Sequence, residues 1–281
     1  MHVVWRIRAK SVPCSCGGFT GPGPPVLEQL GPFRCEPGSL NWTETTELWQ
    51  SGDPFGQSPL VARRATMRRM LLVNEIFRSI QGESTRAGLP CTFVRLTGCN
   101  LRCVWCDTAY AFYEGRRMTV EEVLDEVGRL GCSLVEVTGG EPLAQRESLR
   151  LMAELMGRGH VVLLETGGSL PIAEVPDGVI RIVDVKCPGS GESHRNYWKN
   201  LELLRSGDEV KFVISSREDY LWAVARIREY DLSRRSTVLF SSVHESLPAG
   251  NLAGWMLEDQ VPARLQIQMH KVLWPGVERG I

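Results

Sequence analysis

The sequence predicts an α/β fold, an incomplete (β/α)6-type TIM-like barrel with parallel strands. From Leu71 onward, short apolar runs alternate with helical patterns at intervals of about 20 to 30 residues, which is typical of βα units around a parallel sheet. Six or seven such units fit residues 71–281, fewer than the eight of a closed barrel. Polar residues follow several of these runs, where α/β proteins bind their ligands.

The expected strands are short runs rich in apolar and β-branched residues. They span 92–99, 133–138, 160–166, 179–186, 209–215, 237–242 and 264–270. The helix between the first two begins at a capping box, in which Thr119 is the cap and Glu122 follows three residues later. Apolar residues then recur at helical spacing up to Gly131. Further helices are expected at 149–159, 197–204, 217–230 and 252–258.

Composition is that of an ordinary globular protein. The 281 residues include 43% hydrophobic side chains and carry a formal charge of −1, which favours neither nucleic acid nor a membrane surface as a partner. No apolar run approaches the roughly 20 residues of a membrane-spanning helix. The nine cysteines are odd in number and clustered, which indicates reduced thiols and a cytoplasmic protein.

The first 66 residues differ from the rest because they are rich in Gly and Pro and have no period of a helix or strand. We expect residues 1–66 to be a disordered extension or a wrongly included one, the second case corresponding to a translation start at Met67 or Met70. Residues 67–281 are expected to form the functional domain. A zinc knuckle at Cys14 and Cys16 is the less favoured alternative.

Three cysteines follow the first predicted strand within eight residues. Cys99, Cys103 and Cys106 have the spacing C-x3-C-x2-C. Structural zinc sites require four ligands, and no fourth ligand stands at a suitable spacing. Three thiolates on a four-iron cluster leave one iron open for a substrate or cofactor. The alternative, three buried thiols that only pack, is disfavoured by their density.

These cysteines, with Trp105 before the last of them and with Gly139-Gly140-Glu141-Pro142 after the next strand, resemble the radical S-adenosylmethionine (SAM) superfamily. Several segments resemble more closely the 7-carboxy-7-deazaguanine synthase family. They are Asn74–Ser84, Phe93–Leu96, Gly98–Cys103, Trp105–Thr108 and Gln266–Lys271.

The resemblance implies a cytosolic homodimer that converts 6-carboxy-5,6,7,8-tetrahydropterin to 7-carboxy-7-deazaguanine with loss of ammonia, a carbon–nitrogen lyase reaction in queuosine biosynthesis. It implies a 4Fe-4S cluster, SAM and Mg2+ as cofactors. The strongly reducing cluster that cleaves SAM needs an electron donor such as flavodoxin. No catalytic residue is expected beyond the cluster and the SAM-derived radical.

Residue roles follow from the same resemblance. Cys99, Cys103 and Cys106 would bind the cluster and Thr108 would bind Mg2+. The SAM-binding residues would be Trp105, Cys106, Asp107, Gly140, Asp184, Val185 and Lys186. The substrate-binding residues would be Ile80, Gln81, Gly82, Arg95, Thr138 and Pro275.

The chemistry of the side chains is consistent with these roles. The planar fork of Arg95 matches a carboxylate, and the amide of Gln81 and the carboxylate of Glu83 match the guanidine-like edge of a pterin. The sequence departs from the family at Asp184, where the family has Ser, and at Phe240–Val243, where the family often has Gln-Pro.

Two other functions are consistent with parts of the pattern. An activase of a glycyl-radical enzyme would share the cluster and the Gly-Gly-Glu-Pro segment, but it would dock a large protein and not a pterin. A non-catalytic zinc-binding module would use the cysteines for stability alone.

Overall fold

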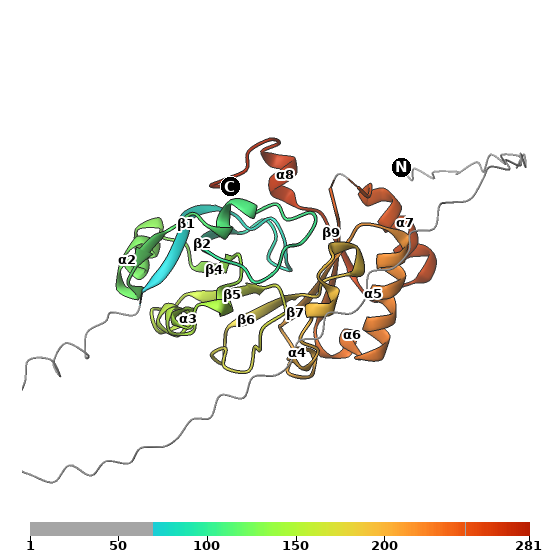
Figure 1. Ribbon diagram of the computed structural model, residues 1–281, viewed down its shortest axis with the longest axis horizontal. Helices are drawn as coiled ribbons and strands as arrows, with labels where there is room; N and C mark the ends of the chain where they lie inside the picture. Colours follow the sequence, from blue (N-terminus) through green and yellow to red (C-terminus); the bar gives the residue numbers. More distant parts are fainter. Residues whose placement is uncertain (1–69, 245) are drawn as a thin grey trace, which may run out of the picture. The chain divides into compact units, whose positions relative to one another are not determined.

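The computed structural model describes residues 70–244 and 246–281, and these belong to one compact unit. The expectations for residues 1–66 therefore fall outside the described part of the chain. The described residues form one sheet in the order β3-β1-β2-β4-β5-β6-β7-β8-β9 (Figure 1). Its strands are β1 (Leu71–Ile80), β2 (Pro90–Leu96), β3 (Arg116–Met118), β4 (Leu134–Gly139), β5 (Val161–Thr166), β6 (Ile180–Asp184), β7 (Glu209–Ile214), β8 (Thr237–Ser242) and β9 (Arg264–Gln266).

Strands β2 and β4 to β9 are parallel, which confirms the predicted incomplete barrel. The sequence patterns did not identify β1 and β3, which add two antiparallel strands at one edge. The helices lie along the outside of the curved sheet in Figure 1, except α8. They are α2 (Val120–Leu130), α3 (Glu147–Gly157), α4 (Lys199–Glu202), α5 (Arg217–Glu229), α6 (Leu232–Arg235), α7 (Ala249–Asp259) and α8 (Met269–Leu273).

Helix α2 begins as its sequence predicts. The Thr119 hydroxyl accepts a hydrogen bond from the Glu122 backbone N–H at 3.2 Å, and the Glu122 carboxylate accepts one from the Thr119 N–H at 2.7 Å. Gly131 ends the helix in the left-handed conformation at φ 71°. All the predicted helices are present, and their ends differ from the predicted ranges by a few residues, whereas α6 and α8 were not predicted.

The predicted strand 264–270 was wrong in its second half. Strand β9 ends at Gln266, and Met269 already belongs to helix α8. Apolar and polar residues alternate in this segment, but the apolar residues are not buried, because Leu265 and Ile267 are 40% and 47% exposed. The N–H of Met269 donates to the carbonyl of Gly82 at 3.1 Å and not to a neighbouring strand.

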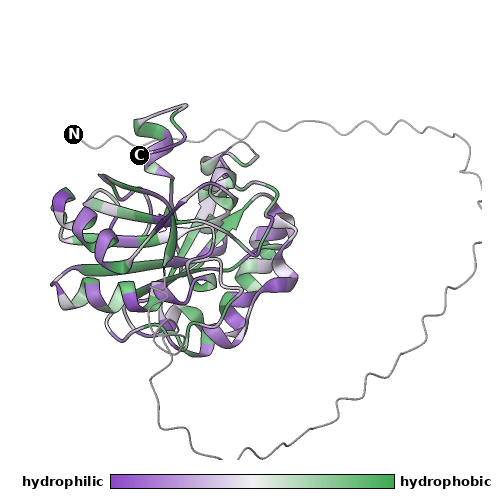
Figure 2. Ribbon diagram, turned by 60° about the vertical axis from the view of Figure 1, so that its left-hand side comes forward, coloured by the Kyte–Doolittle hydropathy of each residue, from purple (hydrophilic) through white to green (hydrophobic). Residues whose placement is uncertain are grey.

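The two faces of the parallel strands bury different side chains. On β4, Val135 and Val137 pack into the main hydrophobic core on the helix side, so strands appear green beneath helices with purple outer faces (Figure 2). The intervening residues Glu136 and Thr138 point to the inner face. A small apolar cluster fills the lower part of that face, and it consists of Cys91, Phe93, Leu134, Leu163 and Ile182.

The loop between β1 and β2, residues 81–89, folds across the inner face and is tied there by side chains. Gln81 hydrogen-bonds Glu136, and Glu83 pairs with Lys211 at 2.8 Å. The backbone N–H of Thr85 donates to the buried carboxylate of Glu209 at 3.1 Å. The β1–β2 loop therefore covers part of the inner face and forms one wall of a cavity.

Candidate active site

A cavity with a volume of ≈ 320 Å³ opens on the inner face of the sheet. This is the size of a small-molecule site. Every predicted site residue except Pro275 lines it: Ile80, Gln81, Gly82, Arg95, Cys99, Cys103, Trp105, Cys106, Asp107, Thr108, Thr138, Gly140, Asp184, Val185 and Lys186. Pro275 is exposed outside the cavity, and Val277 and Glu278 line it instead.

The cysteine loop starts where β2 ends and is held by the neighbouring loops. The Glu141 N–H donates to the Gly98 carbonyl at 2.8 Å, and the Val104 N–H donates to the Ser190 carbonyl at 3.1 Å. A Cβ on Gly140 would collide with the backbone of Gly98 and lie 2.9 Å from the Cβ of Cys99. Only glycine therefore lets the segment after β4 approach the cysteine loop this closely.

The three thiols fit an iron–sulfur cluster better than a single ion. Within 70–244 and 246–281, no group of three or more His, Cys, Asp or Glu side chains is arranged to hold a single metal ion. A four-iron cluster binds each thiol through a different iron, so the sulfurs need not meet at one point. Burial raises the pKa of Cys99, and raises that of Cys103 to about 11, so iron would displace protons on binding.

Glu141 of the Gly-Gly-Glu-Pro segment is fully buried and holds two loops together. Its carboxylate accepts hydrogen bonds from the Thr166 hydroxyl at 2.9 Å and from the Gly167 N–H at 2.8 Å. Glu141 therefore fixes the carboxyl ends of β4 and β5 relative to each other, next to the cysteine loop.

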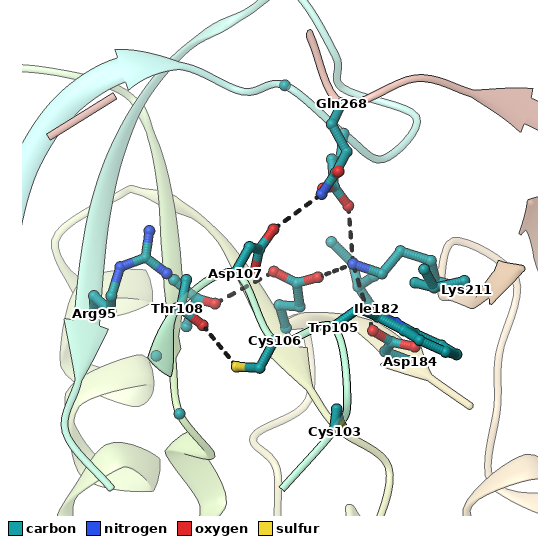
Figure 3. A pocket seen from close by; sticks show the side chains of 18 of the residues that line it. Arg95, Cys103, Trp105, Cys106, Asp107, Thr108, Ile182, Asp184, Lys211 and Gln268 are labelled. Carbon is teal, nitrogen blue, oxygen red and sulfur yellow. Dashed lines mark hydrogen bonds and ion pairs between the residues drawn. The ribbon is translucent and has the colours of Figure 1, made fainter. Parts of the chain in front are cut away.

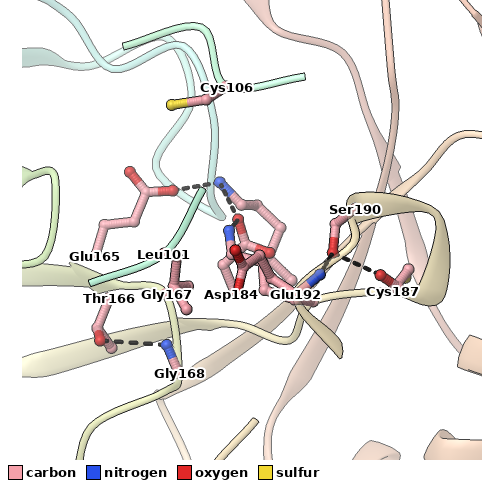
Figure 4. A network of polar contacts seen from close by, with 12 residues as sticks. Leu101, Cys106, Glu165, Thr166, Gly167, Gly168, Asp184, Cys187, Ser190 and Glu192 are labelled. Atoms are coloured by element: carbon pink, nitrogen blue, oxygen red, sulfur yellow. Dashed lines mark hydrogen bonds and ion pairs between the residues drawn. The ribbon is translucent and has the colours of Figure 1, made fainter. Parts of the chain in front are cut away.

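Asp184 offers an unused acceptor to a ligand. Its Oδ2 accepts a hydrogen bond from Lys186 Nζ at 2.9 Å and lies 3.7 Å from Lys211 Nζ, whereas its Oδ1 is buried without a partner in the described part of the chain. Burial lowers the pKa of Lys186, but the charge and hydrogen bond of Asp184 and the charge of Cys103 together outweigh burial, so the net pKa is raised. Figure 4 shows this network beside the Ser190 turn. An orphaned acceptor in a cavity is suited to an amine or hydroxyl of SAM.

Arg95 presents its guanidinium fork to the cavity. Its Nε donates to Glu75 Oε1 at 2.8 Å, and the hydroxyl of Tyr110 donates to the same oxygen at 2.9 Å. The guanidinium also stacks near the rings of Phe77 and Tyr110. Its two terminal nitrogens have no hydrogen bond to any described residue, so they are available for a ligand carboxylate.

Gln81 and Glu83, by contrast, are already engaged within the protein. The amide of Gln81 donates to Glu136 and accepts from the Glu83 N–H at 2.8 Å. Glu83 accepts from Gln268 at 2.9 Å as well as from Lys211. Their side chains therefore line the cavity with polar groups that already have partners within the protein.

Three charged residues on the parallel strands of the cavity were absent from the predicted set. Glu136, Glu165 and Lys211 project from the inner faces of β4, β5 and β7. Figure 3 shows Lys211 across the cavity from Arg95. Lys211 Nζ bonds Glu165 and Glu83, so it neutralises two carboxylates. The signal that could have identified them is a lone charge inside an apolar strand, as in SLVEVT and EVKFVIS.

Thr108 and Asp107 lie at the mouth of the cysteine loop. The Thr108 hydroxyl is 3.8 Å from the Cys106 sulfur. Asp107 accepts a hydrogen bond from Gln268 at 3.2 Å and lies 3.5 Å from the ammonium of Lys271. The C-terminal segment therefore contacts the cysteine loop. The same segment approaches Gly82 so closely that a Cβ there would lie 2.9 Å from Nδ1 of His270, which leaves no room for a side chain.

The fold, the cysteine loop and the Gly-Gly-Glu segment define a radical SAM protein, and residues 93–244 match the Radical SAM superfamily. Two curated 7-carboxy-7-deazaguanine synthases are similar over nearly their whole length. The one from Koribacter versatilis is 46% identical over 224 residues, which are 74% of this chain and 99% of that protein. The one from Chlorobaculum tepidum is 44% identical over 75% of this chain and 97% of that protein. The chain belongs to the 7-carboxy-7-deazaguanine synthase family.

A solved structure supports the fold independently. The crystal structure of QueE from Escherichia coli matches with a TM-score of 0.59 at 21% identity, covering 76% of this chain and 99% of that one. None of the helices in the described ranges is both long and apolar enough to cross a membrane.

Proposed function

We propose that this protein converts 6-carboxy-5,6,7,8-tetrahydropterin to 7-carboxy-7-deazaguanine with loss of ammonia, as a radical SAM lyase of 7-deazapurine biosynthesis. The observation that carries the proposal is one cavity that combines the three cluster cysteines with the free fork of Arg95. The family named for this reaction, at up to 46% identity, supports it. A glycyl-radical activase is disfavoured because the inner-face charges surround a cavity suited to a small molecule.

The test is an anaerobic assay of the reconstituted protein with SAM, a reductant and the carboxytetrahydropterin. Mass spectrometry should detect 7-carboxy-7-deazaguanine, and ammonia should appear in equal amount. SAM cleavage without either product would contradict the proposed substrate while leaving the radical SAM class in place.

The residues of the chain have distinct roles in this proposal. Cys99, Cys103 and Cys106 would hold the cluster, which with SAM supplies the radical that removes a hydrogen atom from the substrate. Gly140, Asp184 and Lys186, together with the segment from Trp105 to Asp107 and Val185, would hold SAM. Arg95 and Thr138 would orient the substrate carboxylate from adjacent strands, because they are directly paired in the β2–β4 register. Ile80 at the end of β1 and Gly82 in the β1–β2 loop would contact the substrate.

We also propose a cytoplasmic homodimer that receives electrons from a donor such as flavodoxin and binds no nucleic acid. The proposal rests on the family and on a formal charge of −1. Light scattering of the holoenzyme tests the dimer, and turnover with flavodoxin and its reductase in place of a chemical reductant tests the donor.

Residues 67–281 are proposed to carry the whole catalytic domain. A chain that begins at Met67 should bind the cluster and turn over at the rate of the full chain. The reason is that the curated relatives match about three quarters of this chain over nearly their whole length. An insoluble or inactive shortened protein would assign residues 1–66 a role in folding or catalysis.

Arg95→Lys should weaken substrate binding by about 10- to 100-fold, because an ammonium keeps the charge but lacks the planar fork, and a charge-assisted contact contributes roughly 1.5–3 kcal/mol. Equilibrium binding of the pterin to the holoenzyme measures the effect. SAM cleavage in the absence of substrate should persist. Arg78→Lys, on the exposed side of β1, is the matched control. Unchanged pterin affinity in Arg95→Lys would exclude the carboxylate role.

Thr108→Val should lose most of the stimulation of turnover by Mg2+. The hydroxyl and two substrate oxygens are proposed to share one Mg2+, which commonly takes only one or two protein ligands. The variant is nearly isosteric, so it should keep its iron content and its SAM cleavage without substrate. Turnover is measured across a Mg2+ titration, and a wild-type response in the variant would place the ligand elsewhere, with Asp107 tested next.

A further inference from the structure

Glu136 is a buried carboxyl of the cavity, and no cationic side chain in the described part of the chain forms an ion pair with it. It projects from the inner face of β4, is 3% exposed and lines the cavity two residues before Thr138. Its Oε2 accepts a hydrogen bond from the Gln81 amide. Its Oε1 has no hydrogen-bond partner among the described residues, although the side chain borders the cavity.

The cations near Glu136 are bound to other carboxylates. Lys211 bonds Glu83 and Glu165, and Arg95 bonds Glu75. A charged Glu136 would therefore be a buried anion beside two further anions. The charged and titratable groups that face it are Glu83, Glu165, Lys211, Arg95 and Cys91.

The protonation state follows from this environment. Burial and then the charge of Glu165 raise the pKa of Glu136 well above its ordinary value of 4.5, against the opposing charge of Lys211. Burial without a paired cation therefore favours the neutral acid form of Glu136 over the carboxylate. Because Oε2 accepts from Gln81, the proton is placed on Oε1, where the carboxylic acid becomes a hydrogen-bond donor.

We propose that Glu136 is a specificity residue that binds the substrate as a neutral acid, donating its O–H to an acceptor atom of the pterin ring. The inference rests on the proposed function and adds a contact on the ring, apart from the carboxylate contact of Arg95. A neutral acid selects a ring nitrogen or carbonyl oxygen, whereas a carboxylate would select N–H groups. It also avoids repulsion of the substrate carboxylate, which an additional anion would cause.

The test measures the affinity of the cluster-loaded protein for the pterin, without reductant, at pH values from neutral upwards. Binding is detected by fluorescence. Wild-type affinity should be full below the pKa of Glu136 and fall by up to about tenfold per pH unit above it, because only the protonated form binds. Glu136→Gln keeps a donor for the ligand and an acceptor for Gln81. It should bind within about threefold of wild type at neutral pH and lack this alkaline loss.

Glu136→Met removes the donor and should bind about 10-fold more weakly or worse, because an acceptor on the ligand is left unpaired. Glu126→Gln, a carboxylate that pairs with Arg116 on the outer surface, is the control and should keep the wild-type pH profile. Any titration of the pterin itself is common to all the proteins and cancels in the comparison.

The outcomes separate the two proposals. A wild-type holoenzyme that binds no pterin contradicts the proposed function. Pterin binding with the same alkaline loss in Glu136→Gln, or with unchanged affinity in Glu136→Met, overturns the role of Glu136 alone.

Infrared spectroscopy provides a readout that does not depend on the affinity of a variant. The wild-type minus Glu136→Gln difference spectrum should contain the C=O band of a protonated carboxylic acid at neutral pH, and the pterin should shift that band. Carboxylate bands in its place, or a band that the ligand leaves unmoved, would overturn the inference.

Discussion

Replacing Cys99, Cys103 or Cys106 by alanine is expected to remove the iron–sulfur cluster and lower turnover by more than about a thousandfold, because the cofactor supplies the chemistry and no described side chain replaces it. Protein purified anaerobically should lose its brown colour, and iron and sulfide should fall from about four per chain towards zero. The thermal unfolding of each apoprotein reports whether the fold is intact.

Cys132→Ala is the matched control for these variants. Cys132 is 6% exposed, as buried as a core residue, and it does not line the cavity. The control should keep its iron content and its turnover. A cluster that survives the loss of Cys103, or that is lost with Cys132, would contradict the assignment of the ligands.

Lys211→Met should destabilise the protein by about 3–5 kcal/mol, the effect expected when one partner of a buried ion pair is removed. The ammonium bonds Glu83 and Glu165 and lies 3.7 Å from Asp184, so three carboxylates would face one another after its loss. Urea unfolding of the apoprotein measures the effect. Lys199→Met on the exposed side of α4 should change the free energy of unfolding by no more than about 0.5 kcal/mol.

The same variant should have a characteristic pH dependence. Burial tends to raise the pKa of Glu83, but the charge and hydrogen bond of Lys211 outweigh burial and lower it. The resulting stabilisation is present above the ordinary pKa of 4.5 and is lost as the pH falls through the lowered value. The difference in stability between wild type and Lys211→Met should therefore be largest at neutral pH and shrink in acid. A difference independent of pH would exclude the charge explanation.

The parallel part of the fold was predictable because its signals are local. Each central strand is a short apolar run, and the cap at Thr119 and the stop at Gly131 surround one helix. Strand β1 was not identified because its ten residues carry Asn, Glu, Arg and Ser among the apolar ones. Its partner β2 lies across a loop whose length and conformation no short pattern specifies.

The site was predictable where residues carry a motif and not where they carry only a charge. The three cysteines and Gly140 stand in short segments with recognisable spacing. Glu136 and Lys211 are single residues 75 positions apart, and only the curvature of the sheet brings them to one cavity. The engagement of Gln81 with Glu136 is likewise a tertiary contact between residues 55 positions apart. Sequence patterns contain no record of such partners.

The closure of the inner face by the β1–β2 loop has a consequence for the order of events during synthesis. The Ser84 N–H donates to Gln266 at 3.0 Å, a residue 182 positions later in the chain. At translation rates of about 5–20 residues per second, roughly 10 to 40 seconds separate the synthesis of the loop from that of Gln266. The cysteine loop emerges from the ribosome within this interval, before Gln268 exists to contact Asp107. A nascent chain therefore exposes its three thiols without a finished cavity around them, and cluster insertion during this interval would meet an open site.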